Sequence, residues 1–389
     1  MSTSRRHFLQ TSATAGAGLA LGLGSAPLHA AAADWADRHT RPVRPRSGHQ
    51  QVAPLRILIL GGTGFLGPHQ VHEALERGHR VTIFTRGRTQ PTVHVRDFDR
   101  VEHLIGDRAD DLTALEGREW DVVLDNSTSR WEWARDSAGL LKDAAGVYLF
   151  VSSTGVYYPY LTTDIDESVE PLSQDPSGGE DGSAAYGVMK TLGERAVQEA
   201  FGERAIVARP QHFTGPGERS NRHNYWVERL DRGGEVLAMG RRSDPVMLLD
   251  VRDLVSFQLD LCESGTGGIF NVAGPASPLT QEEFLHGLRL CTGASVTWTW
   301  VEDYAFLKEH GLYETVPWVM LEGPNLGYTS INIDRALAQG LTHRPLAQTH
   351  LDFRDWWYSD AVPSERREDP RLTRMFEREA EILAAWKSR

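Results

Sequence analysis

The stretch LILGGTGFLGPH, residues 58–69, decides the fold of this chain. It joins an apolar run to a turn with four glycines within seven positions. The four are Gly61, Gly62, Gly64 and Gly67. Glycine loses more conformational entropy on folding than any other residue, so this many in one turn indicate that the backbone comes close to a bound group. A helical pattern at residues 68–78 and a second apolar run at 79–85 follow, which predicts a strand, a glycine turn, a helix and a strand.

The turn matches the pattern G-x-G-x-x-G at residues 62–67, in the strand-to-helix context that dinucleotide binding requires. Without Cβ atoms the backbone can contact a pyrophosphate, and a helix that begins near Gly67 and Pro68 directs its free N–H groups at that anion. We therefore expect the turn to bind NAD or NADP. Its residues are Gly61, Gly62, Thr63, Gly64, Phe65, Leu66 and Gly67.

The residues after the second strand bear on which dinucleotide binds. An acidic residue there would bind the 2′-hydroxyl of NAD, and none is present. Arg86 and Arg88 stand there instead and could pair with the 2′-phosphate of NADP, although two solvated arginines are the alternative. This favours NADP and leaves NAD open. Asp107 ends the third expected strand, where a loop could approach the adenine.

Strand and helix patterns alternate along the following segments, which predicts a doubly wound parallel sheet with helices on both faces, a Rossmann α/β fold. The expected strands are 101–107, 120–127, 146–154 and 204–210, and the expected helices include 131–144 and 184–202. We assign residues 54–215 to a dinucleotide-binding domain. Residues 216–389 are expected to form a smaller mixed α/β substrate-binding part, with segments that return to the main sheet and a C-terminal helix.

Tyr186 and Lys190 form a Y-x-x-x-K pattern on the long helix expected at 184–202, so both side chains lie on one helical face. The chain has only four lysines, which makes the match informative. Ser152, Ser153 and Thr154 end a predicted strand, at the edge where such sheets hold ligands. A tyrosine with a pKa near 10 needs an adjacent cation to act as a base at neutral pH. The alternatives are a helix-surface pair and serines that bind the backbone.

Six segments in this order resemble the extended short-chain dehydrogenase/reductase superfamily, in its NAD-dependent epimerase/dehydratase group. They are GGTGFLG, VSSTGVY, YGVMK, ARPQHFTGPG, LLDVRDLV and FNVAGP, within residues 55–290. Within this superfamily, the motifs resemble those of an atypical branch that includes Tat-exported bacterial members. That branch is in turn similar to the chloroplast stem-loop RNA-binding proteins.

The resemblance implies roles for individual residues. Tyr186 would be the acid/base, and Lys190 would lower the pKa of Tyr186 and bind the nicotinamide ribose. Ser153 would orient the substrate oxygen, with Thr154 as the alternative. Further cofactor contacts would come from Ser152, Pro210 and His212, although His212 could equally be structural. Substrate contacts would come from Asn224, Tyr225, Trp226 and Arg229.

The first 33 residues resemble a bacterial twin-arginine (Tat) signal peptide, with the pair Arg5 and Arg6 before a weakly apolar, glycine-rich stretch. This implies export of the folded protein by the Tat machinery to the periplasm. Residues 34–53 are rich in arginine and proline and are expected to be a linker or a surface arm. Because free NAD(P) should be scarce outside the cytoplasm, export favours chemistry that regenerates the cofactor in each turnover.

The leading hypothesis is a redox-neutral epimerase or dehydratase that acts on a carbohydrate-like substrate through a transient keto intermediate. A plain NADP-dependent reductase and a non-catalytic dinucleotide-bound or RNA-binding protein are the alternatives. A net charge of −12 argues against nucleic acid as a partner. Cys262 and Cys291 show no metal-ligand spacing, and no metal is expected. A homodimer is a possibility by resemblance only.

Overall fold

The apolar run Arg56–Leu60 forms the central strand β1 in a computed structural model that describes residues 52–127, 129–178 and 181–389. The predicted signal peptide and nearly all of the predicted arm at 34–53 lie outside the described residues. Residues 51–389 cluster as one unit. Within the described part, no helix combines the length and apolar character needed to cross a membrane.

Seven parallel strands form the main sheet, in the order β10-β6-β5-β4-β1-β2-β3. Their bounds are β1 Arg56–Leu60, β2 Arg80–Thr85, β3 Glu102–Ile105, β4 Trp120–Asp125, β5 Ala145–Val151, β6 Ala205–Pro210 and β10 Gly268–Val272. The strand order reverses between β1 and β4, and Leu60 pairs in register with Phe84 of β2 and Asp125 of β4. The carboxyl ends therefore line up at the switch point, where folds of this kind bind ligands. The predicted Rossmann fold is confirmed.

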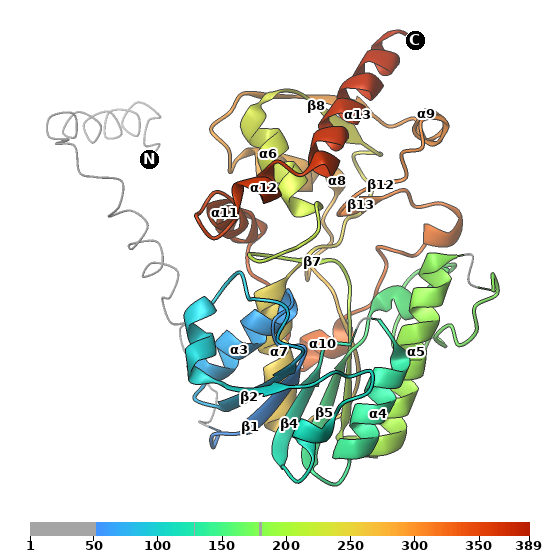
Figure 1. Cartoon of the computed structure of the whole chain (residues 1–389). Helices are drawn as coiled ribbons and strands as arrows, with labels where there is room; N and C mark the ends of the chain where they lie inside the picture. Colours follow the sequence, from blue (N-terminus) through green and yellow to red (C-terminus); the bar gives the residue numbers. More distant parts are fainter. Residues whose placement is uncertain (1–51, 128, 179–180) are drawn as a thin grey trace, which may run out of the picture. The chain divides into compact units, whose positions relative to one another are not determined.

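Helices cover both faces of the sheet, because successive side chains of a buried strand point to opposite sides. Ile57 and Ile59 of β1 belong to the apolar core shared with α3 and α7, whereas Leu58 and Leu60 belong to the core shared with α4 and α5. Figure 1 shows α4 and α5 side by side on one face and α3 and α7 on the other. The bounds are α3 Leu66–Glu76, α4 Trp131–Leu141, α5 Gly182–Phe201 and α7 Val251–Ser264.

The connections on this part of the chain contain four short 3₁₀ helices. They are η1 Val95–Arg100, η2 Thr113–Leu115, η3 Thr154–Tyr157 and η4 Gly202–Arg204. Two strands of two residues each, β7 Phe213–Thr214 and β9 Leu249–Asp250, pair in parallel beyond the end of the main sheet. They lie at the transition to the C-terminal elements.

The C-terminal elements surround two small sheets, a parallel pair β8–β11 and an antiparallel pair β12–β13. The strands are β8 Gly234–Met239, β11 Val296–Val301, β12 Glu314–Thr315 and β13 Trp318–Val319. The helices are α6 His223–Arg232, α8 Gln281–Arg289, α9 Tyr304–Glu309, η5 Gly323–Asn325, α10 Asp334–Ala338, α11 Leu346–Trp357, α12 Ser364–Arg367 and α13 Pro370–Lys387. Strand β10 and helix α10 pack with the main sheet. The boundary expected near residue 215 stays a prediction.

Candidate active site

The glycine turn connects β1 to α3 and has room only for glycine at key positions. Gly61 has a φ of +90°, which side chains rarely allow. A Cβ on Gly67 would overlap the Gly62 carbonyl group, and one on Gly62 would lie 2.7 Å from the Ile83 side chain. At Gly64, by contrast, the nearest atom to an added Cβ is the Gly61 oxygen at 4.0 Å. The turn is thus tightly packed on the inside and open at Gly64.

The N-terminus of α3 offers unpaired N–H groups at this turn. Its N-cap residue, Phe65, supplies no capping side chain, and the first turn of the helix contains no acidic residue. The Phe65 ring stacks on Phe213 at a centroid distance of 5.5 Å, which holds this end of the helix in place. Free donors, a positive helix end and an open Gly64 are what a pyrophosphate requires. The residues of the turn therefore fit a dinucleotide.

The predicted adenosine contacts lie beyond β2 and β3. Arg86 and Arg88 are both exposed, and the described residues provide neither with an ion-pair partner. Asp107 is half-buried, and its carboxylate accepts a hydrogen bond of 3.0 Å from the backbone of Ala109. The two arginines are available to a ligand, whereas Asp107 already caps its own loop.

The side chains of Ser153 and Tyr186 both lie next to Gly155, near the carboxyl end of β5. Ser153 precedes η3, and its Oγ accepts a hydrogen bond of 3.0 Å from the Gly155 N–H group. Tyr186 reaches the same place from α5, whose N-cap residue is Asp181. A Cβ on Gly155 would lie 3.1 Å from the Tyr186 ring and 3.3 Å from Ser153 Oγ. Tyr186 is 39% exposed, so a substrate can reach its phenol.

Lys190 lies one turn further along α5 and is only 1% exposed. Its Nζ donates hydrogen bonds to the carbonyl oxygens of Val151, at 2.8 Å, and Ser127. Val151 is the last residue of β5 and Ser127 lies in the segment that follows β4, so the lysine joins the end of one strand to the loop after the next. Nζ is 5.9 Å from the centroid of the Tyr186 ring. Burial lowers the pKa of Lys190 to about 8, against the opposing effect of Asp125 and Glu194.

The pKa of Tyr186 differs from the expected direction. Burial raises this pKa, and the opposing effects come from a hydrogen bond with Ser153 and from the charge of Arg222. The expectation that Lys190 lowers the pKa of Tyr186 stays a prediction. In the structure the lysine charge interacts with the buried carboxylates Asp125 and Glu194. The cation that influences the phenol comes from the segment before α6.

Ser152 and Thr154 do not point into the site, which corrects both expectations. Ser152 is 3% exposed, and its Oγ donates a hydrogen bond to the buried carboxylate of Glu194. Glu194 in turn forms a 2.6 Å ion pair with Arg209. Thr154 is 2% exposed and hydrogen-bonds to Tyr160. Both side chains support the core beneath the site, because neighbouring residues at a strand end point in opposite directions.

His212 belongs to a cluster that the sequence does not reveal. It follows Pro210, a buried residue that ends β6, and its Nε2 hydrogen-bonds with the Tyr328 hydroxyl. Its Nδ1 lies 3.5 Å from Nη1 of Arg222. Burial, followed by the Arg222 charge, lowers the pKa of His212 to about 3, so the ring is neutral at pH 7.

Arg222 is the residue that sequence reasoning missed. Its side chain is exposed, none of the described carboxylates forms an ion pair with it, and it lines a small hollow together with His212. A signal was present, since Arg222 directly precedes the segment from which substrate residues were expected. Tyr328 had no such signal, because it is more than 100 residues away from His212 in the chain.

The family follows from the match of residues 57–273, more than half of the chain, to the family described as "NAD dependent epimerase/dehydratase family". The chain belongs to this family. The matched range contains the glycine turn, Ser153, Tyr186, Lys190 and Arg222. The resemblance stated from the motifs is confirmed in this respect.

The following relatives and structures share between 15% and 28% sequence identity with this chain. The chloroplast stem-loop binding protein of 41 kDa b from Arabidopsis thaliana is 28% identical over 233 residues, which cover 56% of this chain and 58% of that protein. UDP-glucuronic acid 4-epimerase from Bacillus cereus, crystallised with UDP-glucuronic acid and NAD, has 16% identity and a TM-score of 0.58, and the match covers 77% of this chain and 98% of that one. WbmH from Bordetella bronchiseptica, crystallised with NAD⁺, has 15% identity and a TM-score of 0.59, with coverages of 79% and 100%. The two structures establish the shared fold.

In this epimerase-family chain, helix α6 does not present the expected substrate contacts. Trp226 is 1% exposed and donates a hydrogen bond to the Val316 carbonyl, and Tyr225 stacks on Phe376 of α13. Arg229 pairs with the carboxylate of Glu379. These three residues attach α6 to the C-terminal elements, which corrects the expectation.

Asn224 is also fully buried, but it differs from the other three. Its amide nitrogen donates to Asn221, and its side-chain oxygen has no partner among the described residues. It remains a candidate for a polar contact near Arg222.

The sequence also predicts no metal site, but His72, His94 and Asp97 lie close together in the fold. They are separated along the chain, so no ligand spacing could reveal them.

Proposed function

We propose that this chain binds NAD or NADP at the glycine turn and carries out a redox-neutral transformation of a sugar-like substrate. The observation that carries the proposal is the exposed phenol of Tyr186 beside Ser153, at the same sheet edge as the open glycine turn. Membership of the epimerase/dehydratase family supports it. When bound, the dinucleotide supplies hydride transfer to and from a substrate carbon.

The side chains of the chain supply the proton chemistry. Tyr186 accepts the proton of a substrate hydroxyl as its carbon becomes a ketone, and returns that proton when the hydroxyl re-forms. Ser153 donates a hydrogen bond to the same substrate oxygen and keeps it in line with the phenol. The charge of Arg222 favours the phenolate, since it opposes the effect of burial on the pKa of Tyr186. Lys190 fixes the strand ends on which this geometry depends.

A sugar nucleotide is the substrate class with most support. The Bacillus cereus structure of similar fold is a complex with UDP-glucuronic acid. Arg222 offers an exposed guanidinium whose charge acts on Tyr186, which suits a negatively charged part of such a substrate. The resemblance of the twin-arginine segment with Arg5 and Arg6 to a Tat signal supports a periplasmic location and hence a cofactor that is recycled rather than exchanged.

The first test is to denature the purified protein and identify the released nucleotide by mass spectrometry. The protein is then incubated with a panel of UDP- and dTDP-sugars. We expect an isomerised or dehydrated product with no net change in nicotinamide absorbance. Tyr186→Phe should keep the nucleotide and lose activity by about 10²–10⁴-fold, the usual contribution of a general acid/base. Tyr313→Phe, an exposed tyrosine on a different part of the chain, is the control. Absence of nucleotide, or full activity of Tyr186→Phe, would refute the proposal.

A plain NADP-dependent reductase is the second candidate, because exposed Arg86 and Arg88 suit a 2′-phosphate. The same assay separates the two, since a reductase consumes added NADPH in proportion to product. An RNA-binding role, suggested by the name of the chloroplast relative, has less support because the net charge is −12.

Replacing Arg5 and Arg6 by lysine and fractionating the cells tests the location: the variant should stay in the cytoplasm.

A further inference from the structure

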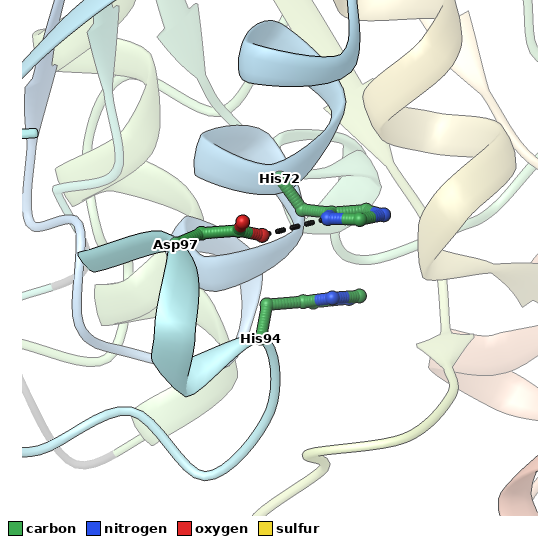
Figure 2. Close-up of side chains that lie close together, drawn as sticks. All are labelled: His72, His94 and Asp97. Atoms are coloured by element: carbon green, nitrogen blue, oxygen red, sulfur yellow. Dashed lines mark hydrogen bonds and ion pairs between the residues drawn. The ribbon is translucent and has the colours of Figure 1, made fainter. Parts of the chain in front are cut away.

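A second cluster of chemically active side chains lies beside helix α3, outside the proposed active site. His72 comes from α3, Asp97 from η1, and His94 directly precedes η1. One donor atom from each residue lies within 4.8 Å of the other two. Figure 2 shows the two imidazole rings facing one another, with the carboxylate at the edge of the His72 ring. Among the described residues, this is the only such group of three.

Hydrogen bonds already orient two of these side chains. His72 Nδ1 and Asp97 Oδ2 are 2.7 Å apart, so the imidazole donates to the carboxylate. The other carboxylate oxygen, Oδ1, accepts a longer bond of 3.3 Å from Arg100. The His94 ring stacks on the His72 ring with a centroid distance of 3.9 Å and an angle of 12°. The three groups are therefore held in contact before any ligand arrives.

A chain of contacts through His69 determines which nitrogen of His94 is free. His69 Nε2 is 2.8 Å from the carbonyl oxygen of Pro216, which can only accept, so this nitrogen carries a hydrogen. In the neutral ring His69 Nδ1 is then an acceptor, and it takes a hydrogen bond of 3.3 Å from His94 Nε2. His94 Nδ1 therefore keeps its lone pair. It has no hydrogen-bond partner among the described residues and is not sealed from solvent.

We propose that His72, His94 and Asp97 form a binding site for a divalent transition metal ion of the zinc class. Two imidazoles and one carboxylate are a donor set that such ions prefer, and three protein ligands leave a further position for water. The ion takes the place of the hydrogen between His72 Nδ1 and Asp97 Oδ2, and the neutral imidazole then carries its one hydrogen on Nε2. Ligand atoms around zinc are about 3.4 Å apart, given Zn–N bonds of about 2.1 Å. Donor atoms up to 4.8 Å apart must therefore approach one another by up to about 1.4 Å, and the two stacked rings must turn so that both lone pairs point at the ion.

The position of the cluster indicates what the ion would do. It would join α3, the helix that begins at the glycine turn, to the segment that enters η1. That segment already packs on the other side, because Val93 lies against Gly217. Metal binding would therefore add a link between two elements that carry no catalytic group. Its expected effect is on stability, and it does not depend on the proposed reaction.

The test is calorimetric titration of Zn²⁺ into the untagged, chelator-treated protein. We expect one ion per chain. His72→Gln and His94→Asn should each weaken binding at least tenfold. Asparagine is chosen at 94 because this residue has a φ of 53°, which asparagine tolerates. Asp97→Asn should also weaken binding.

His286→Gln is the matched control. His286 also lies near a carboxylate, 3.9 Å from Glu282 on α8, but it has no second histidine in such a group among the residues described. The affinity of the His286→Gln variant for Zn²⁺ should equal that of the wild type. The melting temperature of each variant is measured in excess chelator and in saturating Zn²⁺, and Zn²⁺ should raise it only where the site is intact.

Electron paramagnetic resonance of bound Cu²⁺ gives a second measurement, with hyperfine coupling to two imidazole nitrogens in the wild type and to one in His94→Asn. The proposal is overturned if the wild type binds no stoichiometric ion. It is also overturned if His72→Gln and His94→Asn bind as tightly as the wild type, or if His286→Gln loses as much affinity as they do. Should one histidine variant unfold in chelator, the other histidine variant and Asp97→Asn decide the question.

Discussion

The Nζ atom of Lys190 donates a hydrogen bond of 2.8 Å to the carbonyl oxygen of Val151, at the carboxyl end of β5. A second bond to Ser127 reaches the segment after β4. The lysine of the Y-x-x-x-K pattern thus joins the end of β5 to the segment after β4, at the sheet edge that carries the proposed active site. Its removal should affect the fold as well as the chemistry.

We expect Lys190→Met to reduce the free energy of unfolding by about 1–3 kcal/mol, because two buried carbonyl oxygens lose their donor. Lys142→Met is the control. Lys142 is exposed at the end of α4, and its replacement should cost less than about 0.5 kcal/mol. Urea unfolding of the three proteins measures the difference. Equal stability of the two variants would contradict the assigned structural role.

The pKa of Lys190 also predicts a pH dependence. Burial lowers it from 10.5 to about 8, so between these values the unfolded chain binds more protons than the folded one. The contribution of Lys190 to stability should therefore rise with pH from about 8 to about 10.5. The stability difference between wild type and Lys190→Met, measured by urea unfolding across this range, should grow with pH. A stability difference that stays constant or shrinks with pH would show that folding does not lower the pKa of Lys190.

Two glycine substitutions should separate packing from cofactor binding. Gly67→Ala places a Cβ on the Gly62 carbonyl group and should destabilise the protein, because backbone cannot move aside easily. Gly64→Ala meets nothing closer than 4.0 Å and should leave stability unchanged. It should nevertheless weaken dinucleotide binding at least tenfold, since the added methyl group occupies the face open to the pyrophosphate. Thermal melting and calorimetric titration with NAD and NADP are the measurements. Unchanged affinity in Gly64→Ala would place the dinucleotide elsewhere.

The exposed pair Arg86 and Arg88 should determine preference for the 2′-phosphate. Replacing both by serine should weaken NADP binding about tenfold or more, the effect of one or more lost charge-assisted hydrogen bonds, and change NAD binding less than about twofold. Arg289→Ser, an exposed arginine on α8, serves as the control. If affinity for NAD and NADP fell equally, the arginines would act on the shared part of the cofactor or through general charge.

Asp250 should make an acid-sensitive contribution to stability. Burial alone would raise its pKa, but hydrogen bonds and charge from Arg252, with Arg344, lower it to about 2. The stabilisation is therefore complete above about pH 4 and is lost as the pH falls towards 2. Asp250→Asn should cost about 1–3 kcal/mol at pH 7, because Arg252 loses charge-assisted hydrogen bonds and keeps only its ion pair with Asp352, and progressively less below pH 4. Urea unfolding at several pH values, with exposed Asp136→Asn as the control, measures this.

Local patterns of apolar residues in the sequence were sufficient to predict the architecture of the main sheet. The apolar run before the glycine turn, and the alternation of strand and helix after it, predicted the parallel sheet because periodicity depends on neighbours in the chain. The spacing of Tyr186 and Lys190 placed both on α5 for the same reason. Ser153, two residues after β5, was also found beside Tyr186.

The partners of these residues depended on contacts between distant segments. Sequence could not tell that Ser152 faces Glu194 while Ser153 faces the site, because a shift of one residue at a strand end reverses the side chain's direction. Nor could it show that α6 directs Trp226 into the core.

The sequence by itself therefore determined the sheet, the glycine turn and the helix that carries Tyr186, since each is encoded by residues within one or two turns or strands. Only the tertiary structure decided that Arg222 lies close enough to act on the pKa of that phenol. It alone brought His94 beside His72. The physical reason is that charge interactions act through space, and packing sets those distances between segments far apart in the chain.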